Sequence, residues 1–184
     1  GSGMGAMVGA MAALMAQDGF EGAPAITVEA KEVAHHWSDL GHHWTIMDNY
    51  IKPYPICRWA HAALDALGAV MTKHDLAEPD IAKVEVHTFA QAAVLYRAIP
   101  ETTSQAQYSL PFALAVRLVH GHIGPDHIMA DALADPRIAS AHGKIEVRET
   151  ARHSDRFPAG RWSDVTVHTA RGETFSSGDI HARG

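Results

Sequence analysis

The sequence predicts an α+β protein: a two-layer domain in which helices cover one side of an antiparallel or mixed sheet. Five short segments have the alternation or the turn signals of strands: residues 45–52, 81–88, 144–149, 164–169 and 173–176. The last two are joined by a short turn that contains Gly172, which is typical of a β-hairpin. Two long apolar segments with helical spacing, 58–74 and 107–120, would cover the sheet.

The chain begins with an Ala- and Met-rich segment, residues 5–17, that is apolar on nearly every side. A helix of this kind needs burial all round. Asp18 and Gly19 end it, with Gly19 as the C-terminal cap. We expect this helix to be covered by a partner chain or to lie irregularly against the rest of the protein.

The next segments carry two histidine pairs. The pattern predicts a short strand over 25–29, a short helix over 31–40 and a strand over 44–54. His35-His36 and His42-His43 suggest a metal site at first sight. However, adjacent residues point in different directions on a helix, and no acidic or thiol partner stands at ligand spacing. We therefore predict solvated or interface histidines, and no metal.

The stretch from residue 50 to residue 65 concentrates the reactive side chains Lys52, Cys57 and His61, and Cys57 is the only cysteine of the chain. Two prolines hold its first part extended, and helical spacing begins at Arg58. The pattern therefore places Lys52 on a strand or at its exit and Cys57 near a helix N-terminus. It places His61 one turn into that helix.

These residue types suit proton transfer. A thiol at a helix N-terminus gains thiolate character, and a histidine exchanges protons near neutral pH. Asp65, four residues after His61 on the same helical face, could orient the imidazole, and Lys52 could neutralise a substrate carboxylate. A structural interpretation is also open: a lone cysteine is most often a small buried residue, a helical histidine a satisfied one and a lysine a surface charge.

The second long helix, residues 107–120, tolerates Pro111 because proline is accepted in a first turn. This places the N-cap at Ser109, which could offer donors to an anion or act as a plain cap. The remaining segments are predicted as a linker at 77–80, a helical turn at 89–98, a loop at 99–105, helices at 126–133 and 136–142 with Asp135 as a cap, a polar loop at 151–160 and a tail at 178–184. The loop at 99–105 could close over a substrate.

Composition narrows the function classes. A net charge of −6 with neutral histidines argues against nucleic acid as a partner. One cysteine excludes an internal disulfide and favours a reducing, cytoplasmic compartment. No apolar run approaches the roughly 20 residues of a membrane span, and the start lacks the positive flank of a secretory signal.

Four ordered stretches resemble one family. The run Lys-Pro-Tyr-Pro-Ile-Cys-Arg-Trp-Ala-His-Ala-Ala-Leu-Asp, residues 52–65, is similar to the Lys-Pro-Tyr-(Pro/Ala)-x-Cys-Arg-(aromatic)-x-His-x-x-x-Asp segment of the MmgE/PrpD family. Residues 13–24, with Ala-Leu-Met-Ala-Gln-Asp-Gly-Phe, and residues 106–121, with Ala-Gln-Tyr-Ser-Leu-Pro-Phe-Ala, resemble two further segments of that family. Residues 157–175 resemble the tail of its smaller domain.

The resemblance implies a domain organisation. Residues 25–184 would be the α+β lid domain of the family, and residues 1–24 a remnant helix of its helical domain. Relatives are longer and use that helical domain to supply active-site groups. We therefore expect the chain to be a fragment, a truncated form or one half of a split enzyme, with little activity alone.

The resemblance also implies an activity. The family acts on small di- or tricarboxylates without metal or other cofactor and includes 2-methylcitrate dehydratases, cis-aconitate decarboxylase and iminodisuccinate epimerase. Lys52, Cys57 and His61 would be catalytic, and Tyr54, Arg58 and Ser109 would contact the substrate. The expected partners are a helical domain or chain that completes the site and further copies in a homo-oligomer such as a dimer. The alternative is a non-catalytic assembly module.

Overall fold

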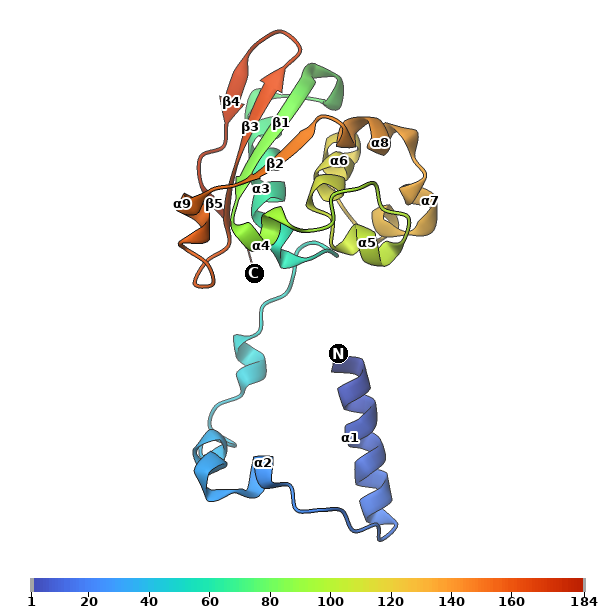
Figure 1. Ribbon diagram of the computed structural model, residues 1–184, viewed down its shortest axis with the longest axis vertical. Helices are drawn as coiled ribbons and strands as arrows, with labels where there is room; N and C mark the ends of the chain where they lie inside the picture. Colours follow the sequence, from blue (N-terminus) through green and yellow to red (C-terminus); the bar gives the residue numbers. More distant parts are fainter. Residues whose placement is uncertain (1, 184) are drawn as a thin grey trace. The chain divides into compact units, whose positions relative to one another are not determined.

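The computed structural model describes residues 2–183 and divides the chain into two compact units, with the division after Asn49. Figure 1 shows the elements of both units in order along the chain. Each unit is described by itself.

The N-terminal unit is made of helical segments. They are α1 (Ser2–Gln17), α2 (Ile26–Glu29) and the 3-10 turns η1 (Lys31–Trp37) and η2 (Thr45–Asp48). Helix α1 ends as predicted, and Gly19 follows it with a φ of 87° that only glycine adopts readily. Within this unit α1 leaves large apolar side chains such as Met4, Met7 and Met11 exposed.

The strands predicted over 25–29 and 44–54 are wrong. Residues 26–29 form a helical turn and residues 45–48 a 3-10 turn. Their backbone groups bond locally instead, with Val28 N–H donating to the Ala25 carbonyl at 2.8 Å and Met47 N–H to the Trp44 carbonyl at 2.8 Å. A strand needs a neighbour for these groups, and no described strand pairs with either segment.

The second unit is built on a mixed sheet, as predicted. Its strands are β1 (Ile81–Thr88), β2 (Ile145–Glu149), β3 (Trp162–Thr169), β4 (Thr174–Ser176) and β5 (Ile180–His181). The order is β2-β1-β3-β4, and β5 pairs with the beginning of β3. Strands β1 and β2 are parallel, whereas β3 is antiparallel to β1, β4 and β5.

Two helices cover one face of this sheet (Figure 1). The 3-10 turn η3 (Arg58–Ala60) leads into α3 (His61–His74), which packs on β3, and α6 (Leu110–His120) packs beside α3. The inward side chains of β1 and β3, including Val84, Val86 and Val165, are fully buried. The other face carries polar pairs such as Lys83 with Glu85, so the unit has two layers.

Helix α6 begins where the sequence predicts. Ser109 is its N-cap, and its Oγ accepts the N–H of Phe112 at 3.2 Å. A cap of this kind contributes about 1 kcal/mol to stability. Asp135 caps the later helix α8 (Pro136–His142) in the same way, through the N–H of Arg137.

Shorter elements connect the layers. They are η4 (Glu78–Asp80), α4 (Ala90–Ala93), α5 (Thr103–Gln107), η5 (Pro125–Ile128), α7 (Ala130–Leu133) and α9 (Ala151–Ser154). The predicted loops at 99–105 and 151–160 therefore contain α5 and α9, and the predicted tail contains β5. Within residues 2–183, no helix has the length and apolar character that crossing a membrane would require.

Candidate functional site

In the structure, the stretch that carries the predicted reactive residues, 50–65, is an extended segment followed by a helix. Residues 50–57 form no strand, so the placement of Lys52 on a strand is wrong. Proline lacks the N–H that a sheet ladder needs, which explains why Pro53 and Pro55 keep this segment unpaired. Lys52 is exposed, whereas the buried side chains of Tyr54 and Ile56 anchor the segment in the core.

Cys57 is the N-cap of η3 and is half-buried. Its N–H donates to the carbonyl of Gln107 at 2.8 Å, and its own carbonyl accepts the N–H of Ala60. This contact brings the Cys57 segment beside the residues that precede α6, including Ser109. Ser109 itself is buried, and its hydroxyl oxygen caps α6. Its predicted contact with an anion remains a prediction.

His61 is fully buried and is the first residue of α3; it follows the 3-10 turn Arg58–Ala60 directly, so it lies one turn into the helical segment that begins at Arg58, as predicted. Its Nε2 lies 3.3 Å from the carbonyl oxygen of Ile56, which fits an Nε2–H donor. The Nδ1 atom is buried and has no hydrogen-bond partner. The ring edge meets the ring of Tyr54 at a centroid distance of 5.1 Å.

Burial lowers the pKa of His61 to about 4, and the positive charges of Lys52 and Arg58 act in the same direction. The Ile56 carbonyl and the Asp65 carboxylate oppose this shift without cancelling it. The imidazole is therefore neutral at pH 7, with Nδ1 as a bare acceptor.

Asp65 does not orient the His61 ring, so that interpretation is wrong. Its carboxylate instead accepts the Tyr54 hydroxyl at 2.6 Å and two nitrogens of Arg183, at 2.6 and 2.9 Å. Arg183 Nη2 also lies 2.9 Å from the Tyr54 hydroxyl oxygen. Burial alone would raise the pKa of Asp65, but the bonds from Arg183 and Tyr54 outweigh it and hold that pKa below its usual value. The Tyr54 hydroxyl is thus engaged within the protein.

Arg183 and His181 come from the segment that the sequence predicts as a tail. Strand β5 pairs Trp162 with His181, and the side chain of His181 lies against the Trp162 indole at a centroid distance of 4.9 Å. Burial lowers the pKa of His181, and the charges of Arg58 and Arg161 lower it further. The alternation of apolar and polar residues over 180–183 is the signal that could have identified this strand.

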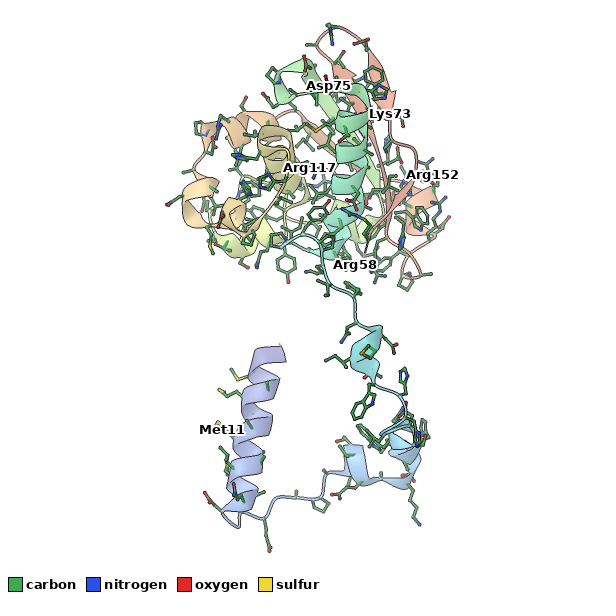
Figure 2. The ribbon with its side chains drawn as sticks, turned by 180° about the vertical axis from the view of Figure 1, so that it is seen from behind. Met11, Arg58, Lys73, Asp75, Arg117 and Arg152 are labelled. Carbon is green, nitrogen blue, oxygen red and sulfur yellow. The ribbon has the colours of Figure 1, made fainter. Side chains whose placement is uncertain are left out.

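The charge of Arg58 acts on both His61, at the start of α3, and His181, in β5. Its guanidinium also lies 4.2 Å from the centre of the Tyr50 ring. Figure 2 shows Arg58 at the N-terminal end of α3, with Lys73 and Asp75 at the opposite end. We call five cations that contact or act on His61, His181, Trp162 or Tyr54 the cationic rim: Lys52, Arg58, Arg156, Arg161 and Arg183.

Two members of the cationic rim are neutralised by carboxylates. Arg183 pairs with Asp65, and Arg156 pairs with Asp179 at 2.8 Å. Across residues 2–183, neither Lys52 nor Arg161 forms an ion pair within 4 Å. The charges of Lys52 and Arg58 act on His61, so positive charge lies beside the predicted site on a chain with a net charge of −6.

A second polar cluster lies at the start of β3. Asp164 accepts His153 Nε2 at 2.7 Å and His87 Nδ1 at 3.1 Å, and Arg152 also bonds to it. Oxygen and nitrogen atoms of His153, Asp164 and Asp179 are close enough to share a metal ion. However, Arg152 pairs with both carboxylates and Arg156 pairs with Asp179, so two guanidinium groups already neutralise their charge. This cluster is an ion-pair network that fixes α9 and the loop after β4 to β3.

Comparison with known proteins agrees with the resemblance seen in residues 52–65. No curated protein matches the chain. The family model described as the MmgE/PrpD C-terminal domain matches residues 54–184, which include Cys57, His61, Asp65 and the strands of the sheet. Since this match covers well over half of the sequence, the chain belongs to the MmgE/PrpD family and carries its C-terminal domain.

Proposed function

We propose that the chain is part of a metal-independent lyase that acts on a small di- or tricarboxylate, in the manner of a 2-methylcitrate dehydratase. The observation that carries this proposal is the cationic rim beside the buried, neutral His61 on an otherwise acidic chain. Concentrated positive charge attracts anionic substrates and raises their local concentration. Decarboxylation and epimerisation are the alternatives within the same family.

The rim also suits the chemistry of this reaction class. Removing a proton beside a carboxylate builds enolate charge, and preorganised cations stabilise that charge as it develops. Lys52 is exposed and free of ion pairs within residues 2–183, so it is the residue that would hold a substrate carboxylate. Arg58 would provide a second positive charge on the same side.

The burial of His61 favours an ordering role over direct proton transfer. A group that transfers a proton must lie within hydrogen-bond reach of the substrate. His61 is fully buried and holds the turn between Ile56 and α3. Cys57, half-buried at the N-terminus of η3, belongs to the site without an assigned step.

We infer that the site is one wall of a binding pocket, because Lys52 is exposed and forms no ion pair within residues 2–183. A helical domain, either part of the same protein or a partner chain, would supply the opposite wall. Water exclusion strengthens electrostatic interactions inside such a closed site.

A turnover assay tests this proposal. The chain is incubated with a panel of di- and tricarboxylates, alone and together with a helical domain of the family. Turnover is expected only in the combined sample, and Lys52→Ala should abolish it while Lys73→Ala, at the other end of α3, should not. Turnover by the chain alone at the rate of a complete enzyme would show that no second wall is needed. No turnover with any substrate in the combined sample would contradict the enzyme assignment.

The exposed apolar side chains of α1 favour a second candidate function, an assembly module without catalysis. Met4, Met7, Met11 and Leu14 are all exposed within the N-terminal unit. Light scattering coupled to size exclusion separates the candidates. A strict monomer that does not bind a helical domain would count against the assembly module, and oligomers with no turnover would support it.

A further inference from the structure

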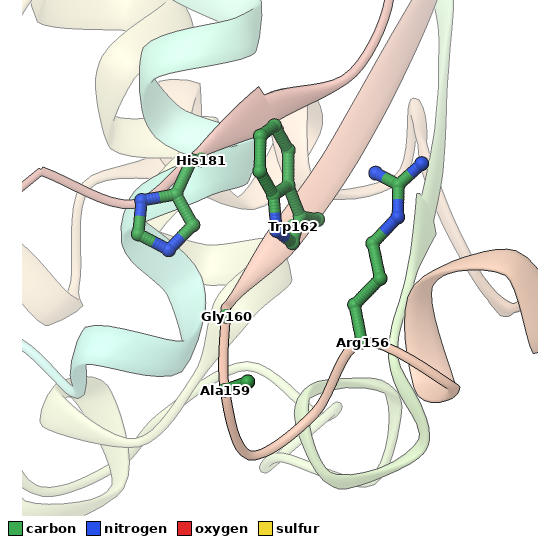
Figure 3. A pocket seen from close by; sticks show the side chains of 5 residues that line it. All are labelled: Arg156, Ala159, Gly160, Trp162 and His181. Atoms are coloured by element: carbon green, nitrogen blue, oxygen red, sulfur yellow. The ribbon is translucent and has the colours of Figure 1, made fainter.

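A shallow cavity of about 460 Å³, wide open to solvent and mostly apolar in its lining, lies beside the start of β3, at the edge that pairs with β5. Arg156, Ala159, Gly160, Trp162 and His181 line it, and Figure 3 shows the Trp162 indole between the His181 imidazole and the Arg156 guanidinium. Its volume falls in the range of small-molecule sites, roughly 300–1,000 Å³. The roles assigned above to Lys52 and His61 do not use these residues.

The cavity depends on glycine at position 160. A Cβ at this position would lie 2.5 Å from Trp162 Nε1 and 3.4 Å from His181 Cδ2. Only a residue without a side chain therefore lets the Nε1 edge of the indole approach the loop that precedes β3 this closely. The Gly160 N–H donates to the carbonyl of Arg156 at 2.7 Å, which closes this loop.

Several donors of the cavity have no partner inside the protein. Among the described residues, no hydrogen bond is formed by Trp162 Nε1 or by either ring nitrogen of His181. Arg156 pairs with Asp179 through Nη1, which leaves other N–H groups of its guanidinium available. An indole N–H, an imidazole and a guanidinium together form a donor set suited to a carboxylate.

The charge around the cavity favours an anion. Arg161 lies against the same loop, where its Nη1 donates to the Pro158 carbonyl at 3.1 Å, and it forms no ion pair within residues 2–183. Asp179 is an acidic group that bonds to this donor set, and both Arg152 and Arg156 pair with it. The local balance is therefore positive.

The next inference rests on the proposed function. We propose that this cavity is a carboxylate subsite, and that it binds the carboxylate of a small polycarboxylate that lies farthest from the reacting carbon. The cavity would then select di- and tricarboxylates over monocarboxylates. Trp162 supplies an N–H donor and an apolar wall, Arg161 supplies charge, and Arg156 supplies the N–H groups that its bond to Asp179 leaves available.

Titration of the ¹⁵N-labelled chain with citrate tests the subsite. The indole N–H resonance of Trp162 is assigned by its absence in Trp162→Phe. Citrate should shift this resonance to saturation, and Arg161→Ala should weaken binding about tenfold, as expected for loss of one charge-assisted contact. Gly160→Ala should weaken it as well, because the new Cβ displaces the indole. Arg171→Ala removes an equal charge from the distant hairpin turn and should leave the affinity unchanged.

The subsite is overturned if sodium chloride at equal ionic strength reproduces the shift, or if both Arg161→Ala and Gly160→Ala bind citrate like the wild type. The result also separates the two proposals. A saturating citrate shift without turnover in the combined assay would support the subsite while the lyase fails. Turnover with an unchanged Trp162 resonance would support the lyase while the subsite fails.

Discussion

At the scale of single residues, His61 combines full burial, one weak hydrogen bond and a lowered pKa. Adding a proton to this imidazole would place a charge in the core beside Lys52 and Arg58, which both oppose it. The residue therefore links the stability of the unit to pH as well as shaping the site.

We expect the stability of the second unit to fall as the pH drops from about 6.5 to about 4. The pKa of His61 is about 4 when folded and 6.5 without burial, so the unfolded chain binds a proton in this window and the folded chain does not. The contribution is complete above pH 6.5, and up to about 3 kcal/mol is lost toward pH 4. Denaturant titrations at pH 7.5 and pH 5 measure it.

His61→Gln should flatten this pH dependence, whereas His42→Gln, an exposed change in the N-terminal unit, should leave it unaltered. A second loss begins as the pH falls below 3.8, the ordinary pKa of an aspartate. The pKa of Asp65 is lowered in the folded chain, so its stabilising contribution is complete above that pH and is lost below it. An identical pH profile for the wild type and His61→Gln would show that His61 is not the group responsible.

At the scale of elements, helix α3 ends on an unusual residue. Asp75 caps the helix in the left-handed conformation, with a φ of 51°, and its N–H donates to the Met71 carbonyl. Glycine adopts this conformation without the steric cost that a Cβ brings. Asp75→Gly is therefore expected to raise the free energy of unfolding by about 0.5–1 kcal/mol.

Asp155 provides the matched control, because it ends α9 with an ordinary φ of −66°. Asp155→Gly should lower stability slightly, since glycine loses more freedom on folding. Thermal melting of the two variants checks the pair, and a melting temperature that falls for Asp75→Gly would refute the conformational argument.

The elements also show what the sequence could reveal. The alternation in 81–88 and the hairpin around Gly172 were predictable because both signals are local. The segment 44–54 has similar alternation but no neighbouring strand, so it does not pair. Strand β5 has only two residues; the alternation over 180–183 is a weak local signal for it, and its pairing with β3 is a long-range contact that such a signal does not specify.

In the candidate site, too, the local signals could be read from the sequence and the long-range contacts could not. Lys52, Cys57 and His61 are visible in one short stretch, and that stretch also carries the family resemblance. Arg183 joins Asp65 across 118 positions, so its place in the site follows from the folded chain and not from spacing.

At the scale of the whole molecule, charge is distributed unevenly. The chain has a net charge of −6, yet the charges of Lys52 and Arg58, two members of the cationic rim, act on His61 at the start of α3. This asymmetry is the basis of the proposed function, since surface cations steer small anions toward the site and salt weakens the effect.

Calorimetric titration of citrate into the chain at low ionic strength, with wild type, Lys52→Ala and Lys73→Ala compared, tests this claim most directly. Both substitutions remove one exposed lysine from the second unit, and only Lys52 belongs to the cationic rim. The account predicts that Lys52→Ala weakens citrate binding about tenfold and that Lys73→Ala leaves it unchanged. Equal affinities for wild type and Lys52→Ala would contradict it.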